Sequence, residues 1–171
     1  FTTALESAIR DAQKAGGHVY IPAKATARVQ TRGLTPTSLD ILIEGDGRNG
    51  TIIQYSGAAP WLTTAAGTRG FSLSHLRVNG SPGSGHLIKL AADFGHVRLT
   101  DLLLAPAAGS DGVNATLGNG IDVVMESVRV DGGLGNIGFN FDSSAGAPPP
   151  INGIVAISCY STGMATNWSF A

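Results

Sequence analysis

The chain has 171 residues, 43% of them hydrophobic, so it can bury one core, and no linker to a second domain is evident. Its formal net charge is −1 and its basic residues are scattered singly, which excludes the basic surface that nucleic-acid binding requires. It has no run of about 18 apolar residues and no basic amphipathic helix, so membrane insertion is not expected. The 24 glycines and 8 prolines supply the turns of an all-β protein. We expect one domain over residues 1–171, either complete or as part of a longer chain.

Residues 1–17 predict a short amphipathic helix. Thr3 and Glu6 have the spacing of a capping box, and the pair Gly16-Gly17 ends the helix. One apolar stripe lies between these signals, at Leu5, Ala8, Ile9 and Ala12. A helix this short needs an apolar surface to cover, and we expect it to cap the first coil of the remaining chain, residues 18–171.

The remaining chain is organised as a repeat. Its pattern is apolar–x–apolar–x–x–apolar–x–apolar, with copies centred on Ile43, Leu73, Leu99, Met125 and Ile157. The two central steps, from Leu73 to Leu99 and from Leu99 to Met125, are equal, and the two outer steps are four and six residues longer. A fixed period of this size indicates stacked supersecondary units. The two-residue alternation within each copy indicates strands with one buried side.

Each copy predicts two strands joined by a short bend, and a third strand completes the coil. The third strands are expected at His86–Leu90, Ile137–Phe141 and Met164–Trp168. The low-complexity segment 143–150 is expected to be a surface loop that lengthens the last step. Three strands per coil favour a right-handed parallel β-helix of about six coils. A leucine-rich repeat is disfavoured because these Gly-rich returns are too short for helices.

The order of these segments resembles a known family. The helix and Gly-Gly lead into His18-Val-Tyr-Ile-Pro22, then Ile41-Leu-Ile-Glu-Gly45-Asp-Gly47 and Thr51-Ile-Ile-Gln-Tyr55. This layout resembles the pectate-lyase-like right-handed parallel β-helix superfamily, and more narrowly its bacteriophage tail spikes and related polysaccharide depolymerases. The resemblance covers essentially the whole chain, and it is specific for fold rather than for activity.

The resemblance implies a polysaccharide or cell-surface glycan as partner and an extracellular or virion-associated location. The chain stops in a strand-like segment without a cap, so either further coils follow or another subunit covers this end. Tail spikes solve the same problem by trimerising, which implies a homotrimer for the second alternative.

Outward-facing residues of neighbouring coils lie side by side, so the repeat positions form columns. One column contains Asp40, Gly70, His96, Asp122 and Ile154, and the next contains Leu42, Ser72, Arg98, Val124 and Ala156. His96, Arg98 and Asp122 are therefore expected together on one exposed sheet face. An imidazole, a cation and a carboxylate can bind an acidic sugar and move its proton. The same trio also fits a solvated ion cluster on the outside of a sheet.

A second set of acids consists of Glu126, Asp131 and Asp142. Two of these carboxylates would suit a retaining hydrolase at about 5.5 Å and an inverting one at about 6.5–9.5 Å. Asp131 heads an Asp-Gly-Gly turn, a position that is typical of turn initiation. The candidate catalytic residues are Asp122, His96, Arg98 and Glu126. No cofactor is expected, although a lyase activity would add Ca²⁺, which needs clustered carboxylates.

The bend inside each copy carries His75, Asp101, Ser127 and Cys159. Repeated geometry explains a repeated position better than chemistry does, so we interpret this column as an inward structural ladder. Trp61 and Trp168 could stack on pyranose rings but are expected to pack. The function stays open between an enzyme, either a polysaccharide lyase or a glycoside hydrolase, and a non-catalytic adhesin or attachment module on the same scaffold.

Overall fold

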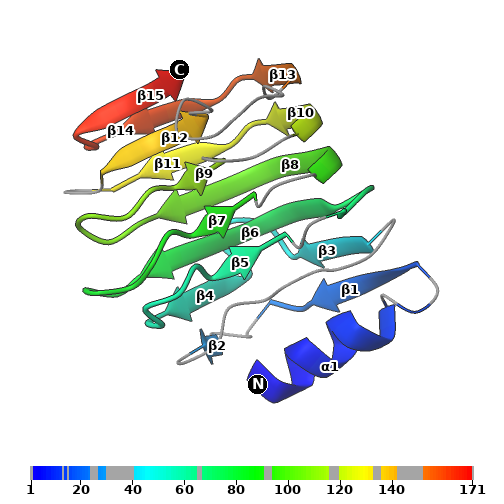
Figure 1. Cartoon of the computed structure of the whole chain (residues 1–171). Helices are drawn as coiled ribbons and strands as arrows, with labels where there is room; N and C mark the ends of the chain where they lie inside the picture. Colours follow the sequence, from blue (N-terminus) through cyan, green and yellow to red (C-terminus); the bar gives the residue numbers. More distant parts are fainter. Residues whose placement is uncertain are drawn as a thin grey trace.

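The computed structural model describes residues 2–12, 14, 16–23, 27–29, 41–64, 67–90, 94–115, 120–132, 136–141 and 152–170. These residues form a parallel β-solenoid with one N-terminal helix, α1 (Thr2–Ala12). Figure 1 shows the strands stacked from α1 at one end to the C-terminal strands at the other. The predicted all-β solenoid with a helix at its N-terminal end is confirmed. In the described part of the chain, no helix has the length and apolar character needed to span a membrane.

The described strands belong to two sheets. The larger sheet contains β1 (Gly17–Ile21), β2 (Ala27–Val29), β3 (Ile41–Gly45), β4 (Ile52–Tyr55), β6 (Ser72–Gly80), β8 (Phe94–Ala105), β10 (Gly120–Glu126), β11 (Arg129–Asp131), β13 (Asn152–Ile157) and β14 (Tyr160–Thr162). The smaller sheet contains β5 (Leu62–Thr63), β7 (Ile88–Lys89), β9 (Val113–Asn114), β12 (Ile137–Phe141) and β15 (Thr166–Phe170). The pairings between these strands are parallel and join one coil to the next, which makes the chain a solenoid.

The solenoid has about four turns, fewer than the six coils expected. In the larger sheet, six strands stack in the order β1, β3, β6, β8, β10 and β13, so they bound five intervals. Each of the last four intervals also contains one strand of the smaller sheet, which completes a turn. The first interval, between β1 and β3, contains no such strand among the described residues. Counting apolar patterns therefore overestimated the complete turns.

The register of the central coils matches the predicted repeat, and the last copy is displaced by one residue. Leu73 pairs with Leu99, and Leu99 pairs with Met125. Met125 then pairs with Ala156 rather than with Ile157, so the last step is one residue shorter than predicted. In the last copy, both sets of alternate residues are apolar. The apolar pattern therefore did not show which set faces the core. A shift of one residue turns each side chain to the other face of the sheet, and Ile157 accordingly points outward.

The third strands are close to their predicted places. β12 has the predicted bounds, whereas β7 is shorter than the predicted His86–Leu90 and β15 lies two residues later than Met164–Trp168. The predicted loop 143–150 lies outside the described residues.

Inward-facing side chains of both sheets form one continuous core. Trp61 is completely buried, and Trp168 stacks on Phe139 with ring centroids 4.1 Å apart, so both indoles pack as predicted. Among the described residues, the large exposed hydrophobic side chains outside β1 belong to the last coil, at Val155, Ile157, Tyr160 and Phe170.

The helix α1 covers the β1 end of this core. Its side chains Leu5 and Ile9 are buried there, while Ala8 is exposed, contrary to the predicted four-residue stripe. Ala12 is partly buried and packs against the core, so three of the four predicted positions face it. Gly16 has a φ of 71°, a left-handed conformation that glycine adopts readily, and the chain turns there from α1 into β1.

Candidate acid–base site on the outer face

Each central coil of the larger sheet bends at two residues with left-handed backbone. The first bend column contains Gly70, His96, Asp122 and Gly153, and the second contains His75, Asp101, Ser127 and Ser158, all with φ between 48° and 74°. The two bends of a coil are five residues apart. Left-handed φ is uncommon for residues other than glycine, and Asn, Asp and His tolerate it best. The histidines and aspartates at these bends are therefore suited to the left-handed backbone that the bends require.

The predicted columns are correct for the central coils and wrong for the last one. Gly153 occupies the place expected for Ile154, and Ser158 occupies the place expected for Cys159, both because the last step is one residue shorter than predicted. Asp40 lies outside the described residues. The second column was expected to point inward, but His75 and Asp101 are partly exposed and contact each other on the outside. The core side of the coil is already filled by the apolar residues that flank each bend.

The strands between the two bend columns present a continuous surface, which we call the outer face. Its two rows of side chains are His18, Leu42, Ser72, Arg98, Val124 and Val155, and Tyr20, Glu44, Ser74, Thr100, Glu126 and Ile157. Neighbouring strands lie about 4.8 Å apart, so the six strands give this face a length of about 24 Å. The outer face is long and mostly polar in its middle coils.

His96 and Asp122 meet at the edge of the outer face, as predicted. The Nδ1 atom of His96 lies 2.8 Å from Oδ2 of Asp122, and the two side chains are 60% and 51% exposed. Because a carboxylate only accepts hydrogen bonds, Nδ1 donates, and Nε2 is left to exchange a proton with a ligand. Arg98 follows two residues later on β8 and is exposed on the same face. The structure thus brings two of the predicted catalytic residues into contact and places the third nearby.

Glu126 also lies on the outer face, but it is separated from Asp122. The two residues are four positions apart on β10, which corresponds to about 13 Å along a strand. This spacing exceeds the range of about 5–9.5 Å between the carboxylates of glycoside hydrolases. Asp131 lies beyond the second bend, where its carboxylate is 2.6 Å from Nη2 of Arg129. The second predicted set of acids is therefore dispersed, and Asp142 lies outside the described residues.

A further charged set crosses four strands, from the outer face to the second bend column, and we call it the charged ladder. Its members are His18, Glu44, His75, Asp101 and Arg48. The carboxylate of Glu44 lies 2.8 Å from Nε2 of His18 and 3.9 Å from Nε2 of His75. The carboxylate of Asp101 lies 3.0 Å from Nδ1 of His75 and 2.7 Å from Nε of Arg48. Both carboxylates thus bridge two basic side chains from different coils.

All four histidines of the chain lie within ion-pair distance of a carboxylate one coil further along. The pairs are His18–Glu44, His75–Asp101, His86–Asp111 and His96–Asp122. The pair at His86 differs from the others, because Nδ1 of His86 accepts the backbone N–H of Asp111 at 3.0 Å and does not donate to the carboxylate. Within each pair the sequence separation equals one period of the repeat, to within one residue. The second and fourth pairs lie in common predicted columns, whereas the other two were not predicted. A search for an acid one period after each histidine would have found them.

Asp111 differs from the other three acids because it is buried, with 1% of its surface exposed. Its Oδ1 accepts hydrogen bonds from Nδ2 of Asn136 at 3.1 Å and from the backbone N–H of Ile137 at 3.0 Å. Its Oδ2 accepts from Nδ2 of Asn114 at 2.6 Å and from Nδ2 of Asn140 at 3.0 Å. These bonds join two consecutive coils, so we interpret Asp111 as a structural link rather than a site residue.

The acids of the outer face do not assemble a cation site. Ca²⁺ takes six to eight oxygen ligands, whereas Asp122 contacts His96 and Glu126 lies at the far end of β10. In the described part of the chain, no three His, Cys, Asp or Glu side chains are placed to hold a metal ion. The Ca²⁺ that a lyase activity would add thus has no fit at these residues.

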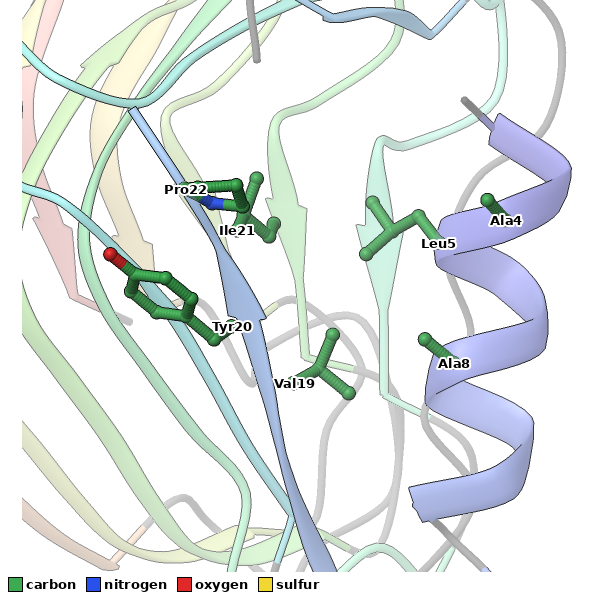
Figure 2. A pocket seen from close by; sticks show the side chains of 7 residues that line it. All are labelled: Ala4, Leu5, Ala8, Val19, Tyr20, Ile21 and Pro22. Carbon is green, nitrogen blue, oxygen red and sulfur yellow. The ribbon is translucent and has the colours of Figure 1, made fainter. Parts of the chain in front are cut away.

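A cavity of about 170 Å³ lies elsewhere, between α1 and β1. Figure 2 shows its lining residues, Ala4, Leu5, Ala8, Val19, Tyr20, Ile21 and Pro22. It is lined mainly by aliphatic side chains and contains none of the histidine–carboxylate pairs. We interpret it as a packing gap under the helix, distinct from the acid–base site.

Comparisons with protein-family models, with curated proteins and with solved structures found no match. The fold itself, a parallel β-solenoid with an N-terminal helix, agrees with the β-helix that the sequence resemblance implied. The narrower relation to pectate lyases and tail spikes stays a prediction.

Proposed function

We propose that the outer face binds an acidic polysaccharide and that His96 and Asp122 cleave it by β-elimination. The observation that supports this proposal is the 2.8 Å contact of His96 Nδ1 with Asp122, which orients a half-exposed imidazole. A general base needs such an orientation together with access to substrate. The length of the outer face suits a polymer, whereas small ligands are usually enclosed by a pocket.

In this reaction Arg98 binds the carboxylate of a uronate by charge-assisted hydrogen bonds. Nε2 of His96 takes the proton from the carbon that bears the carboxylate. The electron pair of that C–H bond forms a carbon–carbon double bond, and the glycosidic C–O bond on the next carbon breaks. The leaving oxygen takes a proton from the imidazolium or from water. Asp122 stabilises the imidazolium while the proton is held.

Elimination fits these residues better than hydrolysis. It needs one base and one cation, which His96 and Arg98 supply. Hydrolysis needs two carboxylates at a defined separation, and Asp122 and Glu126 are about 13 Å apart along their strand. Asp122 is also engaged with the imidazole, so it is not available as a nucleophile.

The test is incubation with acidic and neutral polysaccharides while following new reducing ends and the ultraviolet absorbance of an unsaturated uronate. We expect both signals from a uronate polymer. His96→Asn should lower the rate by about 10²–10⁴-fold, the usual contribution of a general base. Asparagine tolerates the φ of 53° at this bend, so the backbone should be kept. Arg77→Gln, beyond the second bend, is the matched control and should keep the wild-type rate.

Other results have defined meanings. Reducing ends without the ultraviolet signal would show hydrolysis and contradict the elimination chemistry. Absence of cleavage in the whole panel, with the fold verified by circular dichroism, would contradict an enzymatic role.

A second candidate is a non-catalytic attachment module that holds a polysaccharide on the same face. The observation that favours it is the pairing of His18, His75 and His96 with a carboxylate in the next coil, because a repeated structural link accounts for it equally well. This function predicts binding without products, and His96→Asn would then change stability rather than turnover. For either function we propose the extracellular or virion-associated setting and the homotrimer that the resemblance implies.

A further inference from the structure

Tyr20 is an exposed aromatic side chain at the N-terminal end of the outer face. Its side chain is 52% exposed, although it lies in β1 between the buried residues Val19 and Ile21. Figure 2 shows the phenol ring on the opposite side of β1 from α1, so the ring contributes to the outer face and not to the core. The proposed cleavage chemistry does not use it.

The ring of Tyr20 is held in a fixed orientation. Its hydroxyl donates a hydrogen bond to Oδ1 of Asp46, and Oδ2 of Asp46 accepts the backbone N–H of Ala23 at 2.6 Å. The bond to Asp46 is also the main cause that raises the pKa of Tyr20, so the phenol stays protonated as a donor. A pre-oriented aromatic ring loses little conformational freedom when a ligand stacks on it.

Polar groups suited to sugar hydroxyls lie beside this ring. The imidazole of His18 meets the ring edge-on, with centroids 6.4 Å apart and planes at 69°. Nε2 of His18 lies 2.8 Å from the carboxylate of Glu44, which is the direct neighbour of Tyr20 on β3. An aromatic ring flanked by a carboxylate and an imidazole offers an apolar surface for the C–H side of a pyranose and hydrogen-bonding groups for its hydroxyls.

We propose that Tyr20, Glu44 and His18 form a subsite for an uncharged pyranose of the bound polysaccharide. The carboxylates of Glu44 and Asp46 would repel a uronate at this place, whereas Arg98 would attract one further along the face. Three strand spacings separate β1 from β8, about 14 Å, so one oligosaccharide can reach both places. The proposal rests on the proposed function and adds that the recognised polysaccharide contains neutral as well as acidic units.

The test is calorimetric titration with two probes, using protein that carries His96→Asn so that neither probe is cleaved. One probe is a hexasaccharide of alternating glucuronate and N-acetylglucosamine, and the other is a hexasaccharide of galacturonate only. We expect tighter binding of the alternating probe. Tyr20→Ala should weaken that binding about three- to tenfold, the range expected for loss of one aromatic contact. The matched control is Tyr160→Ala, which replaces an exposed tyrosine beyond the second bend. It should bind like the parent, which is the protein that carries His96→Asn alone.

Two more variants keep the test valid if Tyr20→Ala disturbs the fold. Tyr20→Phe keeps the ring and should lose less affinity than Tyr20→Ala. Glu44→Gln removes a charge and should shift the preference between the two probes toward the galacturonate hexamer, which a purely structural role would not do. Equal binding by the parent, Tyr20→Ala and Glu44→Gln would overturn the subsite while leaving polysaccharide binding intact. Failure of the parent to bind either probe would overturn the subsite, and cleavage of a polymer in the panel above would still report on the proposed function separately.

Discussion

Replacement of Asp111 by alanine should be among the most destabilising single changes in the solenoid. Two of the four groups that donate to its carboxylate, the amides of Asn114 and Asn140, belong to buried side chains. A buried donor left without an acceptor costs about 1–3 kcal/mol. These two groups alone therefore predict a loss of about 2–6 kcal/mol in the free energy of unfolding. That loss is a large part of the roughly 5–15 kcal/mol that is usual for a domain.

Asp111→Asn should cost less than Asp111→Ala. The asparagine keeps one accepting oxygen, and the amides of Asn114 and Asn140 can rotate so that their oxygens accept from its new NH₂ group. The backbone N–H of Ile137 can only donate, so the retained oxygen of the asparagine should occupy the position of Oδ1. Asp122→Asn is the matched control, because Asp122 is half-exposed and should change stability by less than about 1 kcal/mol.

Urea unfolding followed by circular dichroism gives the three free energies, with the slope m checked for constancy. The expected order of loss is Asp111→Ala, then Asp111→Asn, then Asp122→Asn. If Asp111→Ala and Asp122→Asn were equally stable, the four hydrogen bonds would not be holding the coils together. If Asp111→Ala cannot be folded, the comparison of Asp111→Asn with Asp122→Asn still tests whether the hydrogen bonds of Asp111 hold the coils together.

Further predictions concern the core, the thiol, the first strand and the assembly. Leu99→Ala, at the completely buried centre of β8, should cost about 2–5 kcal/mol in urea unfolding, and a loss well below about 1 kcal/mol would be inconsistent with a tightly packed core. Burial is the main cause that raises the pKa of the Cys159 thiol, so a disulfide reagent at pH 8 should label the folded chain more slowly than the urea-unfolded chain; equal rates would contradict this. Tyr20→Phe removes the hydrogen bond that most lowers the pKa of Asp46. A group with a lowered folded pKa stabilises above its unfolded pKa and loses this effect as the pH falls through its folded pKa, so the difference in Tm from wild type should be present at pH 7 and vanish in strong acid. A difference that stayed constant with pH would argue against this link. Light scattering should give three times the monomer mass if the implied homotrimer forms, and a monomer at micromolar concentration would refute it.

The fold was largely predictable because stacked coils give equivalent positions the same environment. Leu73, Leu99 and Met125 each fill the same inward place, so the sequence repeats the same kind of residue once in every period. The register of the last coil was not predictable from this rule. There the side chains are mostly exposed, and Ile157 could be apolar without being inside.

The candidate site was predictable only where its contacts follow the columns of the repeat. His96 and Asp122 share a column, and their contact followed directly from the period. Within the charged ladder, His75 and Asp101 also share a column. Its other contacts did not follow from the columns, because Glu44 reaches diagonally from its strand to a bend and Arg48 comes from a turn outside the repeat. Such contacts depend on side-chain direction, which the spacing of residues along the sequence does not specify.

The constant spacing of the bends makes the length of this molecule adjustable. In the central coils each bend returns after one full period, as from His96 to Asp122, so the segment 97–122 begins directly after one bend and ends at the equivalent bend of the next coil. A chain in which this segment occurs twice would gain one coil and about 4.8 Å in length, with the pairing of every other strand kept. Duplication of a short stretch of gene could therefore lengthen the surface offered to a polymer without redesign of the two ends.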